Sequence, residues 1–322
     1  MWKAIVLIAA AVGVATSPPA RADYPDRAIR LVVPYPAGAG TDSSARIVAD
    51  ALSRRLGQQI VVDNRPGASG TIGVDYVAKS APDGYTLLWT SIDSITLVPA
   101  LKGPKLPYRV PEDLAFIGKF CETGMALVAS SKLPVSDLGE FIAYAKANPG
   151  KVNYGTSGVG GAPHLGTLLL AKYSDIKLTH VPYKGIAPAM AAMLGGETEL
   201  TFPAVLSGMA HFKSGRLRPL AIAGKSRYPA LHDVPTAAEA GLAGFEIDYW
   251  YGLFGPAGLP APIVQQIQRD VAATMTTPEM KESLLAQGSV AIASGPEELD
   301  KRVRDELALW TRVVKAGNVK VE

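Results

Sequence analysis

The sequence has little of what disulfide-stabilised and metal-binding proteins contain: one cysteine and four histidines among 322 residues. Cys121 cannot form an internal disulfide and is expected to be a buried, small apolar residue. The histidines lack the spacing of a metal-binding motif, which argues against a metal site. They are His164, His180, His211 and His232.

Catalytic and nucleotide-binding motifs are also missing. The dinucleotide fingerprint fails at Gly38-x-Gly40-x-x-Ser43 and again at Gly158-x-Gly160-x-x-Pro163, because both lack the third glycine. The nucleophile elbow fails because Val159 stands where it requires glycine. No Walker motif is present. The sequence therefore predicts neither catalytic residues nor a cofactor.

Long apolar runs are absent after the first residues. Residues 1–22 have a basic start at Lys3, a run of about eleven apolar residues and the small-x-small ending Ala20-Arg21-Ala22, which together indicate a signal peptide cleaved after Ala22. That run is too short to span a bilayer. Because the leader contains Lys3, Arg21 and no acidic residue, cleavage lowers the net charge from +3 to +1. A mature chain so close to neutral gives no indication of nucleic-acid binding.

The stretch Pro34–Asp42, with the sequence P-Y-P-A-G-A-G-T-D, is the most informative segment present. A strand-like apolar run over residues 29–33 precedes it, and apolar residues at helical spacing follow it as far as Gly57. The stretch is therefore predicted to be a turn leading into a helix, with Thr41 or Asp42 as the helix cap. Two interpretations remain open: an anion site built from backbone N–H groups, or a tight turn that binds nothing.

A second glycine-rich turn repeats this pattern. Residues 153–155 form a short predicted strand, and the following turn leads into a predicted helix over residues 163–172. The turn contains Thr156, Ser157, Gly158, Gly160 and, at the helix start, His164. A cleft with one turn on each side is suited to an elongated anion.

Strand-like and helical patterns alternate along most of the chain, which predicts two α/β lobes with mainly parallel sheets. Residues 99–113 are rich in proline, lysine and glycine and are interpreted as a crossing between lobes. Residues 220–223 are interpreted as the return to the first lobe.

Taken together, the motifs resemble those of the Bug/TctC-like periplasmic solute receptors of tripartite tricarboxylate transporters. Pro34, Tyr35, Gly38 and Asp42 match the opening pattern P-[FY]-x-x-G-G-x-x-D, although Ala39 replaces its second glycine. Further matching segments are 64–68, 81–88, 149–158, 164–165, 180–185, 233–236, 239–241 and 250–254. The resemblance covers nearly the whole mature chain.

The resemblance implies a two-lobed periplasmic binding protein of the type II-like α/β class, with the ligand in the interlobe cleft. Residues 23–122 and 225–322 are expected to form lobe 1, and residues 123–224 lobe 2. Both glycine-rich turns are expected to hold the ligand, largely through backbone amides and bridging water. The candidate ligand-binding residues are Tyr35, Ala37, Gly38, Ala39, Gly40, Thr41, Asp42, Thr156, Ser157, Gly158, Gly160 and His164.

Some side chains have more than one interpretation. Asp42 is interpreted as a helix cap rather than as the partner of a cationic amine. Tyr35 is expected in the cleft, whereas Lys184, Trp250 and Tyr251 are left open between structural and ligand-facing roles.

The resemblance also implies a function: a monomeric receptor that captures a small carboxylate and delivers it to the membrane permease subunits of a transporter. A ligand sensor for a two-component system is the alternative that the sequence leaves open. A periplasmic enzyme is a third class, but it lacks a catalytic constellation in this sequence.

Overall fold

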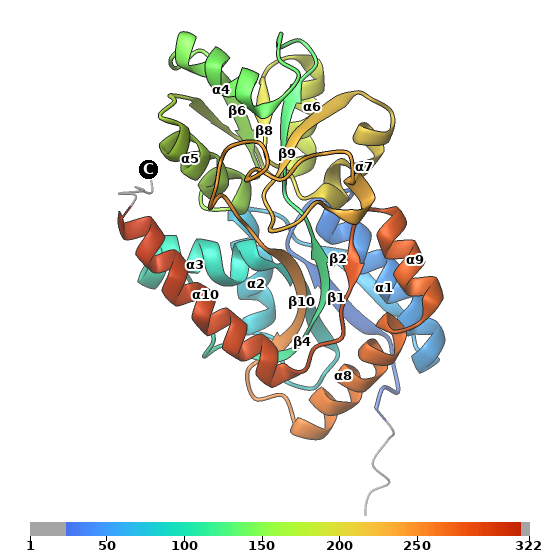
Figure 1. Ribbon diagram of the computed structural model, residues 1–322. Helices are drawn as coiled ribbons and strands as arrows, with labels where there is room; N and C mark the ends of the chain where they lie inside the picture. Colours follow the sequence, from blue (N-terminus) through green and yellow to red (C-terminus); the bar gives the residue numbers. More distant parts are fainter. Residues whose placement is uncertain (1–23, 317–322) are drawn as a thin grey trace, which may run out of the picture.

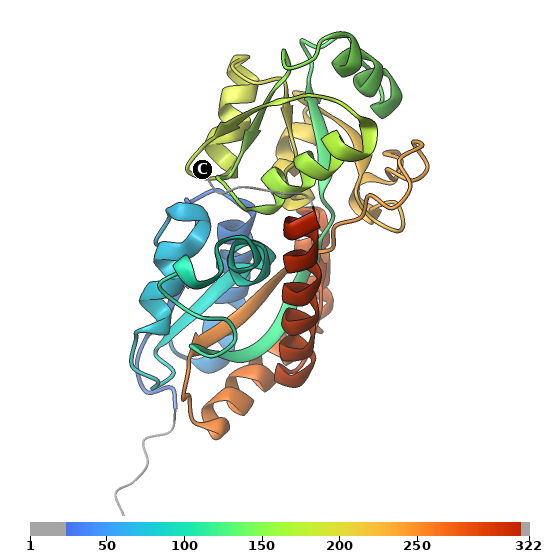
Figure 2. The ribbon, with the colours of Figure 1, turned by 90° about the vertical axis from the view of Figure 1, so that its left-hand side faces the viewer.

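The computed structural model describes residues 24–316, which fold into two lobes, each built around its own sheet (Figure 1). The predicted signal peptide, residues 1–22, lies outside the described residues. Both views show one lobe above the other, with the glycine-rich turns at the junction (Figures 1 and 2). Within residues 24–316, no helix combines the length and apolar character needed to cross a membrane.

The larger lobe contains a six-stranded sheet in the order β11-β4-β10-β3-β1-β2. Its strands are β1 (Ile29–Val33), β2 (Ile60–Asn64), β3 (Thr86–Ser91), β4 (Leu114–Thr123), β10 (Tyr249–Pro256) and β11 (Val290–Ala291). Helices α2 (Thr71–Ala78), α3 (Val98–Lys102) and α10 (Pro296–Ala316) lie on one face of this sheet (Figure 1). Helices α1 (Gly40–Leu56), α8 (Ala261–Met275) and α9 (Pro278–Ala286) lie on the other.

The smaller lobe contains a five-stranded sheet in the order β7-β6-β8-β5-β9. Its strands are β5 (Ala126–Ser130), β6 (Asn153–Thr156), β7 (Thr179–Pro182), β8 (Leu200–Thr201) and β9 (Leu217–Ile222). Its helices are α4 (Leu138–Ala147), α5 (Ala162–Ser174), α6 (Ile186–Gly195) and α7 (Val205–Lys213).

The α/β class and the two-sheet organisation are as predicted, but both sheets are mixed rather than mainly parallel. In the larger sheet, β10 pairs antiparallel with both β3 and β4. In the smaller sheet, β5 pairs antiparallel with β8 and β9. Consecutive parallel strands are joined by a crossover, usually a helix. The strands β4 and β10 are not consecutive, because the chain leaves the larger lobe after β4 and re-enters it at β10, where it runs in the opposite direction.

Two predictions about where the chain crosses between lobes are wrong. Residues 99–113 stay with the larger lobe, where α3 packs against α10 and the Tyr108 hydroxyl donates to the Ser94 carbonyl at 2.7 Å. Residues 220–223 do not return the chain to the first lobe, because β9 is an edge strand of the smaller sheet. The crossings lie between β4 and β5 and between β9 and β10.

The first βα unit has the local structure that its sequence dictates. The apolar strand β1 is buried at Ile29, Leu31 and the two valines that follow. Helix α1 ends at Gly57, whose φ of 66° is left-handed and whose N–H donates to the Ser53 carbonyl. Glycine adopts this conformation without the penalty that a Cβ brings. The unit thus fixes the start of α1 at the junction of the lobes.

Candidate functional site

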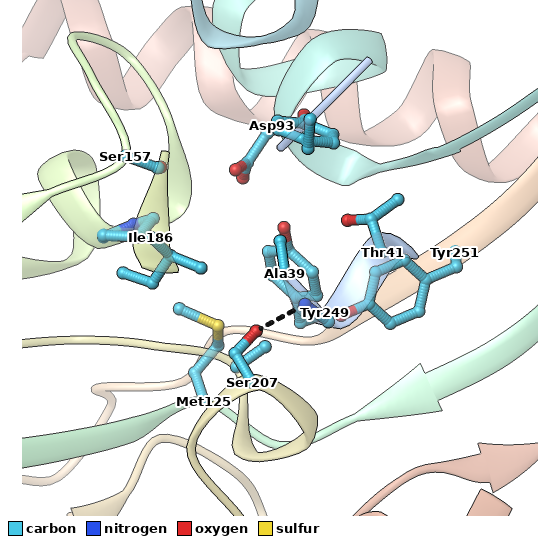
Figure 3. A pocket seen from close by; sticks show the side chains of 13 residues that line it. Ala39, Thr41, Asp93, Met125, Ser157, Ile186, Ser207, Tyr249 and Tyr251 are labelled. Atoms are coloured by element: carbon cyan, nitrogen blue, oxygen red, sulfur yellow. Dashed lines mark hydrogen bonds between the residues drawn. The ribbon is translucent and has the colours of Figure 1, made fainter. Parts of the chain in front are cut away.

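A small cavity lies between the lobes, with a volume of about 20 Å³ (Figure 3). The larger lobe contributes Tyr35, Ala39, Gly40, Thr41, Asp93, Tyr249 and Tyr251 to its wall. The smaller lobe contributes Met125, Ser157, Pro163, Ile186, Ala204 and Ser207. This volume accommodates about one water molecule, so a larger molecule requires the lobes or the lining side chains to move apart.

Three hydrogen bonds connect the lobes around this cavity. The Gly40 N–H donates to Ser207 Oγ at 3.1 Å, the contact drawn in Figure 3. The Ala162 N–H donates to Asp93 Oδ1 at 2.9 Å. Ser69 Oγ donates to the Val159 carbonyl at 3.0 Å. The two glycine-rich turns are therefore part of the interface at which the lobes meet.

The first turn leaves donors available at the start of α1. The helix begins at Gly40 behind Ala39, and no side chain caps it, so the predicted cap by Thr41 or Asp42 is wrong. Within residues 24–316, neither the Thr41 N–H nor the Asp42 N–H has a hydrogen-bond acceptor. Orphan N–H groups at the positive end of the helix dipole favour an anion.

Hydrogen bonds to the buried carboxylate of Asp42 fix the shape of the first turn. Asp42 Oδ2 accepts from the Gly38 N–H at 2.9 Å and from Arg46 Nε at 3.0 Å, and its Oδ1 accepts from Asn64 Nδ2 at 2.9 Å. Burial alone raises the pKa of Asp42, but the hydrogen bonds from Arg46, Gly38 and Asn64 outweigh it and hold the pKa below its usual range. With its oxygens occupied in this way, Asp42 is a positioning residue of the turn.

Asp42→Ala is expected to lower the free energy of unfolding by about 1–3 kcal/mol, because it leaves the Gly38 N–H without its acceptor and removes one of the two acceptors of Asn64 Nδ2. Since the folded-state pKa of Asp42 is depressed, its contribution is present above pH 3.8 and is lost as pH falls below that value. Urea unfolding at pH 7 and pH 3 measures the effect. The matched control is Asp50→Ala in the same helix, where the side chain is 70% exposed rather than 4% and a change below about 0.5 kcal/mol is expected. Equal losses in the two variants would contradict the positioning role.

In the second turn, His164 binds the local backbone. The Gly160 N–H donates to His164 Nδ1 at 3.2 Å, and the imidazole stacks on that of His180 at 4.3 Å between centroids. Burial, and secondarily the His180 ring, lower the pKa of His164 to about 4, so the ring is neutral at pH 7. Thr156 Oγ1 lies 2.7 Å from His180 Nε2 and also accepts from the Gly158 N–H at 3.2 Å. Thr156 and His164 thus stabilise the conformation of the turn without lining the cavity.

The structure brings together only part of the predicted ligand set. Tyr35, Ala39, Gly40, Thr41 and Ser157 line the cavity. The other seven predicted residues do not line it: Ala37, Gly38, Asp42, Thr156, Gly158, Gly160 and His164. Of these, Gly158 lines a neighbouring outer pocket of about 270 Å³, which shares Tyr35 and Ser157 with the cavity.

The three side chains whose roles the sequence did not decide lie in different places. Trp250 is fully buried in the larger lobe, where its indole N–H donates to Glu306 at 3.0 Å. Tyr251, the next residue, faces the cavity. Lys184 lines the outer pocket together with Lys102 of α3. Alternation along β10 explains why neighbouring aromatic residues have different surroundings.

Sequence reasoning missed Asp93 and Ser207. Asp93 opens a π-helical turn, Asp93–Leu97, directly after β3, and it is buried at the cavity wall. The signal available in the sequence was an acidic residue within the apolar segment that follows a strand. Ser207, near the start of α7, has no comparable signal. Among residues 24–316, no group of three or more acidic, histidine or cysteine side chains is placed to hold a metal ion.

A family model described as the tripartite tricarboxylate transporter family receptor matches residues 44–319. The chain belongs to this receptor family. Both the fold class and the family indicated by the sequence motifs are thereby confirmed.

Solved structures of similar receptors superpose over almost the whole chain. The periplasmic binding protein BugD is 31% identical with a TM-score of 0.88, covering 93% of this chain and 100% of its own. Rpa4515 of R. palustris, solved with adipate, is 32% identical with a TM-score of 0.90, covering 92% and 99%. MatC of Rhodopseudomonas palustris, solved with bound malate, is 32% identical with a TM-score of 0.86, covering 90% and 100%. BugD is a periplasmic binding protein, and the family to which this chain belongs is a family of transporter receptors.

Proposed function

We propose that this receptor captures a small carboxylate between its lobes and delivers it to the membrane permease subunits of a tripartite tricarboxylate transporter. The observation that carries the proposal is the start of α1, where the Thr41 and Asp42 N–H groups have no acceptor among the described residues and Thr41 faces the interlobe cavity. Two similar receptors solved with adipate and malate support the carboxylate class.

The proposed mechanism is closure of the two lobes on the ligand. A ligand that touches both lobes stabilises the closed arrangement only by its additional affinity for that arrangement. The cross-lobe bonds of Gly40 with Ser207 and of Asp93 with Ala162 are available only when the lobes meet. Because the cavity that these bonds enclose holds about one water molecule, the bound carboxylate favours the same arrangement once the lining side chains have moved to make room for it.

The proposal includes a monomeric protein in the periplasm that does not alter its ligand chemically. The similarity to the periplasmic receptor BugD and the signal-peptide pattern of residues 1–22 support this location. Cleavage after Ala22 leaves Asp23 as the first residue, which mass spectrometry of the exported protein tests. A protein recovered from the cytoplasm with its leader intact, or ligand recovered chemically changed, would contradict this part of the proposal.

Small carboxylates are expected to raise the melting temperature of the mature protein and to reduce its radius of gyration. A ligand at about one hundred times its Kd stabilises the native state by about 2.7 kcal/mol if it binds only that state. A thermal-shift screen of mono-, di- and tricarboxylates identifies the ligand, and small-angle scattering with and without it measures closure. The matched alcohols serve as controls, since they lack the anionic group. If no carboxylate stabilises the protein the proposed function fails, and unchanged dimensions at saturation would contradict closure.

A further inference from the structure

The helices that follow the two glycine-rich turns, α1 and α5, differ in the donors that their N-termini leave free. At α5, the Ala162 N–H already binds Asp93, Pro163 has no N–H, and the His164 N–H donates to the Gly161 carbonyl at 3.0 Å. At α1, the Thr41 and Asp42 N–H groups have no acceptor among the described residues. Of these two termini, the one at α5 is occupied by a carboxylate of the protein itself, and the one at α1 remains for a carboxylate of the ligand.

Asp93 is a negative charge on the wall of the cavity. Its side chain is buried, with the residue 3% exposed, and its hydrogen-bond donors are the Ala162 N–H and the Tyr249 hydroxyl. The other groups that face it are the phenols of Tyr35 and Tyr251, and across residues 24–316 no cationic side chain forms an ion pair with it. A buried charge without a counter-charge is costly, and a second carboxylate placed beside it would be repelled.

Ser157 supplies an independent indication of a ligand. The residue is 7% exposed, and its Oγ is buried without a hydrogen-bond partner in the described chain. Buried hydroxyls are rarely left unpaired, so this oxygen points to a missing partner in the cavity. Figure 3 shows the Asp93 carboxylate directed toward the interior, with Ser157 across from it on the smaller lobe.

The Ser157 and Asp93 oxygens lie close together across the junction of the lobes. A Cβ built on Gly161 would lie 3.0 Å from Ser157 Oγ and 3.1 Å from Asp93 Oδ2, so the two oxygens are at most about 6 Å apart, and both residues line the cavity. An ammonium group donates three hydrogen bonds and accepts none, so one nitrogen in the cavity matches two acceptor oxygens at this separation. A carboxylate beside the same oxygens would meet one donor, Ser157, and one negative charge, Asp93.

We propose that Asp93 is a specificity-determining residue and that the ligand is an amino carboxylate. Its carboxylate binds the free N–H groups of α1, and its ammonium group lies between Asp93 and Ser157. This inference rests on the proposed function, because it assumes that a carboxylate binds between the lobes. It narrows the substrate class from small carboxylates in general to those that carry a cationic amine.

Titration calorimetry with matched probes tests the inference. Each amino carboxylate is compared with the analogue in which a methyl group replaces the ammonium: L-alanine with isobutyrate, and 4-aminobutanoate with pentanoate. Succinate, glutarate and adipate represent the dicarboxylates. In the wild-type protein, at least one amino carboxylate is expected to bind at least tenfold more tightly than its methyl analogue and than every dicarboxylate.

Asp93→Asn removes the charge while keeping an oxygen that can accept from Ala162. This variant is expected to reduce the preference for the ammonium probe at least tenfold and to strengthen dicarboxylate binding. The matched control is Asp270→Asn in α8, which removes a negative charge paired with Arg55 far from the cleft and should leave every affinity unchanged. An Asp93→Asn protein with the wild-type preference would overturn the inference.

Gly161→Ala is a second variant that does not depend on removing a charge. The φ of Gly161 is −75°, a conformation that alanine adopts readily, and circular dichroism verifies the fold. Its methyl group would lie 3.0 Å from Ser157 Oγ and 3.1 Å from Asp93 Oδ2, where it obstructs the approach of an ammonium group, and it is expected to weaken binding of the ammonium probe at least tenfold. If dicarboxylates bind the wild-type protein more tightly than all amino carboxylates, the inference fails and the proposed function stands. If no probe binds, both fail.

Discussion

Gly40→Val is expected to weaken binding of the tightest carboxylate by about a hundredfold while each lobe keeps its fold. A Cβ on Gly40 would lie 2.5 Å from Ser207 Oγ and 3.0 Å from the Tyr251 hydroxyl oxygen, and valine adds two further carbons. Ser207 belongs to the other lobe, so the side chain obstructs closure and also removes the space for the Gly40–Ser207 bond. Without closure the ligand carboxylate also loses one or two charge-assisted hydrogen bonds, worth about 1.5–3 kcal/mol each, which gives an effect of this size.

The reason for glycine at this position is space, not backbone conformation. Among the residues of this turn the left-handed glycine is Gly38, with φ of 79°, whereas Gly40 is the first residue of α1. Calorimetry measures the affinity of the variant, and melting curves verify its fold. Gly57→Ala at the far end of α1 is the control, because it strains a left-handed residue with open space around it and should lower stability without changing affinity. Wild-type affinity in a folded Gly40→Val protein would contradict closure around this turn.

Asp93→Asn is expected to make the ligand-free protein more stable than the wild type at neutral pH, by up to about 3 kcal/mol. Burial raises the pKa of Asp93 from 3.8 to about 6, against the smaller opposing effect of the Ala162 N–H and the Tyr249 hydroxyl. Because the folded-state pKa is the higher one, Asp93 does not destabilise the protein below pH 3.8, where it is protonated in both states. The wild type then loses stability relative to the variant as pH rises from about 4 to about 6.

Urea unfolding of both proteins between pH 3.5 and 7.5 measures this difference. The two stability curves are expected to converge at the acid end and to separate by a constant amount above pH 6. The groups that face Asp93 are the phenols of Tyr35, Tyr249 and Tyr251, which remain protonated throughout this range because burial raises their pKa values. A variant that is less stable than the wild type at pH 7 would show that the α5 terminus stabilises the charged carboxylate more than burial penalises it.

Local features of the fold were predictable because neighbouring residues determine them. The strand before Pro34, the helix that follows and its stop at Gly57 all depend on periodicity and on one glycine conformation. The free cysteine, Cys121, is buried as expected.

Features that depend on distant residues were not predictable. The antiparallel pairing of β4 with β10 joins segments more than a hundred positions apart, and no local pattern specifies its direction. The same is true of the site: Asp93 reaches a helix terminus that begins at residue 162, and Ser207 reaches the turn at Gly40. Two similar glycine-rich turns therefore suggested two equivalent anion sites, whereas the structure fills one of them with a carboxylate from the opposite lobe.

A crystal structure of the mature protein with its tightest-binding carboxylate tests directly whether the ligand binds the start of α1. We expect a carboxylate oxygen within about 3 Å of the backbone nitrogen of Thr41 or Asp42, with the Gly40–Ser207 contact closed over it. A carboxylate found instead in the outer pocket beside Lys102 and Lys184, with the α1 N–H groups facing solvent, would contradict it.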